Sequence, residues 1–212
     1  MQLFVYDEGE LLSAEQMEDK SVKIYTIIGG VNGAGKSSFT GALKSERKDL
    51  GVIIDVDKIT AAVGGNAIKG GKIAITRIDE CLSRGVCFTQ ETTLSGQKTL
   101  HTIERARKAG YLIRLYYIGL DTLQECIKRI DNRVFKGGHN IPRSDVIRRF
   151  ESRFSSLLRV LPYCDEAVFF DNDNGFVEVA EYDNGEVIPK GDYRPIWLSD
   201  LRMEIIQRMN KS

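Results

Sequence analysis

The sequence predicts an α/β protein in which five strands form a mainly parallel sheet covered by helices on both faces. Short apolar runs alternate along the chain with segments whose apolar residues recur at helical spacing. Strands that alternate with helices in this way are typical of parallel sheets. A glycine-rich loop between the first run and the first helix is the second observation. The last 40 residues differ and predict a β-hairpin followed by a helix.

Composition favours a single domain over residues 1–212. Of the 212 residues, 42% are hydrophobic and 28% charged, which are ordinary globular values. The 30 basic and 30 acidic residues cancel, so we expect neither a nucleic-acid partner nor a membrane partner. The four cysteines are widely spaced and acidic residues lie near the N-terminus, which predicts a reduced, cytoplasmic protein.

The elements follow in order from apolar patterning. For residues 1–21, a docked extension and a free tail are both consistent with the sequence. The strands are predicted at 22–28, 52–56, 86–90, 111–118 and 167–170. Helical spacing connects them, and one helix at 142–161 combines an apolar face with several arginines. The hairpin is predicted at 176–188 around Asp183-Asn184-Gly185, and the last helix at 197–209.

The glycine-rich loop fits the phosphate-binding pattern G-x-x-x-x-G-K-[ST] at every fixed position. Its glycines let backbone N–H groups close around phosphates, Lys36 supplies positive charge and Ser37 offers a hydroxyl to Mg²⁺. The chain is therefore predicted to be a P-loop NTPase. The predicted nucleotide-binding residues of the loop are Gly30, Asn32, Gly33, Ala34, Gly35, Lys36, Ser37 and Ser38.

Polar residues follow three predicted strands, at the edge where ligands bind in open parallel sheets. Asp55 and Asp57 follow the second strand, and we choose Asp57 as the base for an acceptor hydroxyl. In the alternative reading, one of this pair caps the next helix and the other holds Mg²⁺ through water. Glu91 follows the third strand and could serve metal or substrate. Asp171-Asn172 follows the fifth.

A basic, glycine-hinged segment at 133–150 has the features of a closing lid. Arginine suits a transferring phosphoryl group because it binds oxygen pairs with two N–H groups. In the alternative reading, any single arginine of this segment lies on a solvent-exposed basic face of a helix and binds no ligand. A hydrogen bond in the lid or to substrate is the preferred role of His139. The polar residues of the segment are Arg133, Lys136, His139, Arg143, Arg148 and Arg149.

These motifs together resemble the zeta-toxin family of P-loop kinases. The resemblance covers about residues 24–172 and rests most specifically on Glu91-Thr92-Thr93-Leu94-Ser95-Gly96 and Gly137-Gly138-His139. It implies a fold of the nucleotide-kinase type, use of ATP with Mg²⁺, and transfer of the γ-phosphoryl group to a sugar hydroxyl of UDP-N-acetylglucosamine. It also implies a small antitoxin protein as a partner.

The resemblance extends to roles for individual residues. It implies catalysis by Lys36, Asp57, Arg133 and Arg148 or Arg149, and places Asp171 and Asn172 near the adenine. We expect metal contacts at Ser37, Asp55 and Glu91. Expected acceptor contacts are Asp57, Glu91, Thr92, Thr93, His139 and Arg143. Two alternatives stay open: a kinase for another hydroxyl metabolite or nucleoside, and an ATP-binding switch without an acceptor.

Overall fold

A seven-stranded sheet forms the centre of the fold. The computed structural model describes residues 22–138 and 140–210, so the expected extension at 1–21 lies outside the described residues. The strand order is β2-β3-β1-β4-β5-β6-β7. The strands are β1 (Ile24–Gly29), β2 (Val52–Asp55), β3 (Phe88–Thr92), β4 (Leu112–Gly119), β5 (Glu166–Asp171), β6 (Val177–Asp183) and β7 (Glu186–Pro189).

The predicted strand count of five for the sheet is wrong, because the C-terminal hairpin joins the sheet. Strands β1 to β5 pair in parallel, and β6 then pairs antiparallel with β5. The hairpin turn has Asn184 at φ 48° and Gly185 at φ 89°, the left-handed conformations that a tight two-residue turn needs. Without this pairing β5 would expose unpaired backbone groups along the edge.

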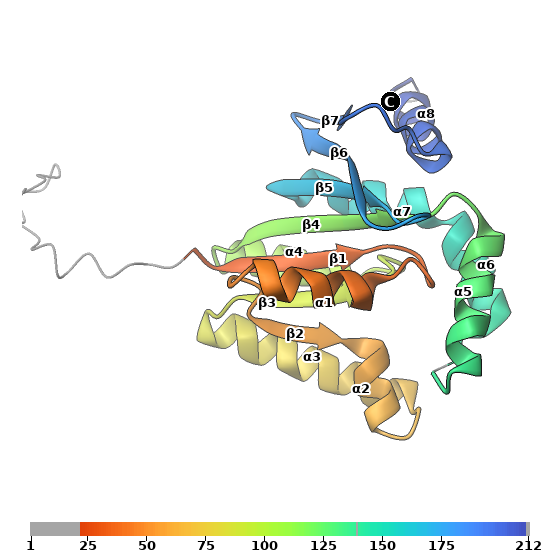
Figure 1. Ribbon diagram of the computed structural model, residues 1–212. Coiled ribbons are helices and arrows are strands. Elements are labelled where there is room, and N and C mark those ends of the chain that lie inside the picture. The colour runs from red at the N-terminus through yellow and green to blue at the C-terminus, as the bar shows by residue number, and fades with distance from the viewer. Residues whose placement is uncertain (1–21, 139, 211–212) are drawn as a thin grey trace, which may run out of the picture.

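Helices cover both faces of the sheet. Figure 1 shows α1 in front of the sheet, α4 and α7 behind it, and α5 and α6 beyond the end at which β1 and β2 point. The helices are α1 (Lys36–Glu46), α2 (Val56–Ala62), α3 (Ala67–Arg84), α4 (Lys98–Lys108), α5 (Leu123–Phe135), α6 (Arg143–Glu151), α7 (Arg153–Val160) and α8 (Ile196–Met209), with a 3₁₀ turn at Leu161–Tyr163.

The sheet separates two apolar cores. One core packs α3, α4, α7 and α8 against one face, and the other packs α1, α5 and α6 against the opposite face. Strand side chains alternate between the two, so that Ile27 belongs to the first core and Ile28 to the second. Both isoleucines are fully buried, as expected for a central strand covered on both sides.

Two glycines permit the close contacts that fix α5 and α8. A side chain at Gly33 would lie 2.7 Å from the Cys126 carbonyl oxygen, so the glycine lets α5 approach the phosphate loop. A side chain at Gly119 would lie 2.1 Å from the ring of Trp197, the fully buried residue at the start of α8. Both glycines lie next to the end of the sheet where the ligand is expected.

Every helix within 22–138 and 140–210 is too short or too polar to span a bilayer. All four cysteines are free thiols: Cys81 and Cys126 are buried, while Cys87 and Cys164 are only partly buried.

Candidate active site

The phosphate loop connects β1 to α1 at one wall of a large cleft. Gly35 precedes α1 at φ 92°, and no side chain caps the first turn of that helix. Its backbone N–H groups are therefore suited to an anion. The Lys36 ammonium donates to the carbonyl oxygens of Gly30 (2.9 Å) and Val31 (3.0 Å). Burial lowers the pKa of Lys36, and the nearby Asp57, Glu91 and Asp55 carboxylates oppose that shift.

Beside the loop, Ser37 lies between two carboxylates. Its hydroxyl donates to Glu91 Oε2 at 2.6 Å and lies 3.3 Å from Asp55 Oδ2. Asp55 and Glu91 are register partners on the neighbouring strands β2 and β3, and both are buried. The other carboxylate oxygen of Glu91, Oε1, is buried and has no partner among the described residues. An oxygen-only donor set with an unsatisfied carboxylate oxygen fits Mg²⁺.

The two aspartates after β2 occupy different positions. Asp55 accepts a hydrogen bond from the Lys58 backbone N–H (3.1 Å) and so caps α2. Asp57 lies in the first turn of α2, is exposed and lines the cleft. The helix-capping alternative therefore describes Asp55, and Asp57 is the carboxylate available to a ligand in the cleft.

Two of the predicted arginines converge on this cleft from α5 and α6. The Arg133 guanidinium lines it, and its buried Nε and Nη2 have no partner among the described residues. Arg149 donates from Nη1 to Asn32 Oδ1 of the phosphate loop at 3.0 Å, and its Nε is also buried without such a partner. Unpaired buried donors are costly, so both side chains are arranged for an anionic ligand.

Among the other predicted lid residues, Lys136 also lines the cleft, whereas Arg143 and Arg148 lie outside it. Arg148 is exposed and pairs with Asp145 one turn earlier, at 2.7 Å, and Arg143 is exposed at the start of α6. Neither side chain is among those lining the cleft, because α6 turns its Arg149 face inward. His139 lies outside the described residues.

The cleft has a volume of about 800 Å³ and contains further polar residues that we did not predict. Arg129 lines it and donates from Nη2 to the backbone oxygen of Asn172 at 2.6 Å. Arg129 could have been found in the sequence, because it precedes Arg133 by one helical turn and so lies on the same face of the helix. The other unpredicted polar lining residues are Gln90, Ser95, Lys98, Thr99 and Asn132. The predicted Thr92 and Thr93 also line the cleft.

The two predicted residues after β5 differ in position: Asn172 lies in the cleft and Asp171 in the interior. Asn172 lines the cleft and donates from Nδ2 to the carbonyl oxygen of Ala34 at 2.8 Å. Asp171 is buried away from it and accepts from the indole N–H of Trp197 at 2.8 Å. The structure therefore gives the Asp171 carboxylate a packing partner, and only its neighbour reaches the nucleotide side of the cleft.

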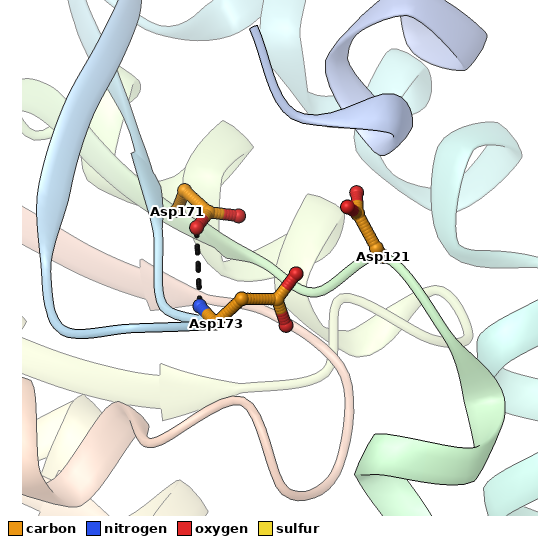
Figure 2. Close-up of side chains that lie close together, drawn as sticks. All are labelled: Asp121, Asp171 and Asp173. Atoms are coloured by element: carbon orange, nitrogen blue, oxygen red, sulfur yellow. Dashed lines mark hydrogen bonds between the residues drawn. The ribbon is translucent and has the colours of Figure 1, made fainter. Parts of the chain in front are cut away.

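Asp171 also belongs to a cluster with Asp121 and Asp173, shown in Figure 2. The Asp173 backbone N–H donates to Asp171 Oδ2 at 3.1 Å, the dashed line in that view. Asp121 Oδ1 accepts from the Trp197 backbone N–H at 2.9 Å. Burial, together with the other two carboxylates, raises the pKa of Asp173. Protein donors thus reach all three carboxylates, since the Asp121 backbone N–H bonds to Asp173, and the two bonds from Trp197 anchor α8.

Comparison with solved structures establishes the fold. The chain superposes with a TM-score of 0.57 and 17% identity on a structure from the PezAT chromosomal toxin-antitoxin system of Streptococcus pneumoniae, over 91% of this chain and 88% of that one. It superposes with a TM-score of 0.62 and 16% identity on a chain of the AvrRxo1-ORF1:AvrRxo1-ORF2 complex solved with ATP, over 88% and 64% respectively.

The chain therefore has the fold of these two structures, with a P-loop between β1 and α1 at one wall of the cleft. The chain belongs to the same family as an uncharacterized protein of Haemophilus influenzae, to which it is 31% identical over 127 residues, 57% of this chain and 88% of that protein. A comparison with protein-family models found no match.

Proposed function

We propose that the protein is an ATP-dependent kinase that transfers the γ-phosphoryl group to a sugar hydroxyl of a nucleotide sugar, UDP-N-acetylglucosamine. The proposal rests on one observation: the predicted base and the predicted phosphate-binding residues line the same cleft. Asp57, which is exposed, lines the same cleft as Lys36 and the unpaired guanidinium of Arg133. A proton acceptor beside a phosphate loop and an anion-binding arginine is what phosphoryl transfer to a hydroxyl requires.

Each group has a chemical role in the proposed reaction. Lys36 and the loop N–H groups bind the phosphates, with Asn172 on the nucleotide side. Asp57 accepts the proton of the acceptor hydroxyl as its oxygen forms the new bond to the γ-phosphorus. The bond from that phosphorus to the β,γ-bridging oxygen breaks, and ADP leaves with the electron pair. Arg133 and Arg149 neutralise charge on the transferring group.

Ser37, Asp55 and Glu91 would hold Mg²⁺, whose bound form neutralises phosphate charge. The Ser37 hydroxyl donates to Glu91 Oε2 at 2.6 Å and lies 3.3 Å from Asp55 Oδ2, so the three oxygens lie close together. Because Asp55 also caps α2, metal binding and the placement of Asp57 on that helix depend on the same side chain.

The choice of acceptor rests on the zeta-toxin resemblance and on the second half of the cleft. Thr92, Thr93, Ser95 and Thr99 line that half with hydroxyl groups. Hydroxyl-rich walls suit a polyhydroxylated acceptor, since each hydroxyl both donates and accepts hydrogen bonds. The cleft volume of about 800 Å³ lies within the range of pockets that enclose small-molecule ligands.

The proposal is tested by incubating the protein with ATP and UDP-N-acetylglucosamine and following the mass of the nucleotide sugar. We expect one phosphoryl group to be added and Asp57→Asn to lower kcat by about 10²-fold or more while ATP still binds. Label appearing only on a different hydroxyl compound would favour the alternative kinase. ATP turnover that needs no acceptor and is equal in wild type and Asp57→Asn would favour the regulatory switch.

We propose a small antitoxin protein as the partner, supported by the toxin-antitoxin system to which the Streptococcus pneumoniae structure belongs. Expression of the wild type should then slow bacterial growth, whereas Asp57→Asn should not. Co-expression of a small protein encoded beside this chain should restore growth and co-purify with it. Normal growth with active wild-type enzyme would contradict the partnership and leave the kinase proposal intact.

A further inference from the structure

A glutamine occupies an unexpected place on the floor of the cleft. Gln90 lies on β3 in register with Ile27 of β1 and Ile54 of β2, both fully buried. Gln90 is itself only 8% exposed, yet it lines the cleft. An amide among apolar side chains is costly unless its polar groups are bonded. The hydrogen bonds of the Gln90 amide therefore indicate what this side chain does in the cleft.

The side chain of Gln90 belongs to the acceptor half of the cleft. Successive strand residues point to opposite faces, so Gln90 faces away from Glu91. Glu91 points to the face of α1, where it meets Ser37. Thr92 shares the face of Gln90, and its hydroxyl lies 3.2 Å from that of Thr99 on α4. Gln90 thus lies with the hydroxyl groups rather than with the metal-binding carboxylates.

A buried tyrosine fixes which end of the amide faces the cleft. The Tyr25 hydroxyl donates to Gln90 Oε1, while the ring stacks on Phe88 with centroids 4.4 Å apart. Tyr25 is 0% exposed, and burial raises its pKa far above the usual range, so the hydroxyl keeps its proton. Turning the amide over would present N–H groups to that proton in place of the acceptor Oε1.

The orientation leaves the amide nitrogen free to act on a ligand. None of the described residues accepts a hydrogen bond from Gln90 Nε2. Because Oε1 is committed to Tyr25, the part of the side chain that meets the cleft is a donor with two N–H groups. A donor at this place selects for an oxygen acceptor and against a second donor or an apolar group.

We propose that Gln90, oriented by Tyr25, is a specificity-determining residue that donates from Nε2 to a hydroxyl or carbonyl oxygen of the phosphoryl-acceptor substrate. The inference rests on the proposed kinase function. Gln90 contacts the substrate, whereas Tyr25 is a positioning residue that acts only through the amide.

The test compares steady-state kinetics of four full-length proteins: wild type, Tyr25→Phe, Gln90→Glu and the control Tyr111→Phe. The control is matched because Tyr111 is also buried and packs on Phe88, but its hydroxyl donates to the backbone oxygens of Cys81 and Val86. The acceptors are a panel of UDP-N-acetylglucosamine, a nucleoside and a simple sugar, each with labelled ATP.

We expect Tyr25→Phe to raise the acceptor KM about three- to tenfold and Gln90→Glu to raise it at least about tenfold, with the KM for ATP within twofold of wild type. Tyr111→Phe should leave the acceptor KM unchanged. If wild type labels the acceptor but Tyr25→Phe matches Tyr111→Phe, or Gln90→Glu binds acceptor normally, the inference alone is overturned. If wild type labels no panel member, the proposed function fails and the inference falls with it.

Discussion

Arg133 and Arg149 show at the residue scale how the cleft is prepared for an anion. They come from different helices, and among the described residues there is no partner for the buried Nε and Nη2 of Arg133 or for the buried Nε of Arg149. Such donors destabilise the protein when no ligand is bound and are used fully only by a multiply charged anion. The cost in stability and the gain in binding therefore come from the same side chains.

Replacing either arginine should accordingly lower activity. We expect Arg133→Ala and Arg149→Ala to reduce kcat about 10²- to 10³-fold, because each removes a donor aimed at charge that develops during transfer. Arg133→Ala should also raise the melting temperature of the ligand-free protein by about 1 to 3 °C. Acceptor phosphorylation and thermal unfolding measure the two effects.

Arg148→Ala is the matched control, since Arg148 is exposed and paired with Asp145 outside the cleft. Its kcat should stay within about twofold of wild type. An Arg148→Ala loss as large as that of Arg149→Ala would contradict the assignment of Arg149 to the cleft.

The sequence alone does not decide whether Arg148 or Arg149 points into the cleft. A basic stretch ending in two adjacent arginines identifies the helix but not which arginine points inward, because neighbours on a helix differ by about 100° in direction. Packing of α6 against α5 decides between them. The place of the phosphate loop between β1 and α1 could be predicted, because the spacing of its glycines and Lys36 is specific to such loops.

At the scale of elements, the sequence predicts the parallel strands well and the place of the hairpin poorly. Apolar runs bounded by turns identify β1 to β5, because most of the residues of these strands are buried or half-buried. Strand β6 follows β5 after residues 172–176 and pairs with its free edge, but the hairpin pattern of β6 and β7 does not itself indicate that the hairpin joins this sheet. No sequence pattern around Gly119 indicated its role either, although its close contact with Trp197 fixes the position of α8.

That contact predicts the effect of adding one methyl group. Gly119→Ala would place a carbon about 2 Å from the Trp197 ring, so α8 must shift. We expect a loss of about 1 to 3 kcal/mol and a melting temperature lower by about 2 to 10 °C. Because the chain has one tryptophan, a red shift of its fluorescence would report the displacement directly.

Gly41→Ala is the matched control, because Gly41 lies on the exposed side of α1 and an added carbon there meets nothing within 4 Å. It should raise stability by about 0.5 to 1 kcal/mol through helix propensity. Equal melting temperatures for Gly119→Ala and wild type would show that α8 is not held by this contact.

The acidic cluster beneath α8 predicts a stabilising substitution. Burial and two neighbouring carboxylates raise the pKa of Asp173, so its charged form disfavours the folded state at neutral pH. Asp173→Asn should raise the free energy of unfolding at pH 7 by up to about 1 kcal/mol, since partial exposure screens the charges. The gain should shrink as the pH falls through the folded pKa of Asp173, as measured by urea unfolding. A destabilised variant at pH 7 would contradict repulsion within the cluster.

At the scale of the whole molecule, an ion network remote from the cleft ties three parts of the fold together. Arg114 of β4 is 5% exposed and pairs with Asp49 at 2.8 Å and with Glu166 of β5 at 2.6 Å. Asp49, between α1 and β2, also binds Arg47 at 2.7 Å. Because Arg114 is buried, loss of Asp49 would leave its charge compensated by Glu166 alone.

The network predicts how stability depends on pH. The Arg47 and Arg114 guanidinium groups hold the pKa of Asp49 well below its usual range. A depressed folded pKa contributes stability above the unfolded value, about 3.9, and loses it as the pH falls toward the folded value. Asp49→Asn should therefore cost about 1 to 2 kcal/mol at pH 7, since Glu166 still pairs with Arg114 and solvent partly screens Asp49, and the difference from wild type should narrow below about pH 4.

Urea unfolding at pH 7, 5 and 3 distinguishes this ion pairing from ordinary packing. Asp192→Asn serves as the control, because Asp192 is exposed and should change stability by less than about 0.5 kcal/mol at each pH. A deficit in Asp49→Asn that stays constant from pH 7 to 3 would mean that Asp49 acts by shape and hydrogen bonding alone. A deficit that closes with acid would assign it to charge, since only the ionised form of Asp49 adds to the compensation that Glu166 gives the buried Arg114.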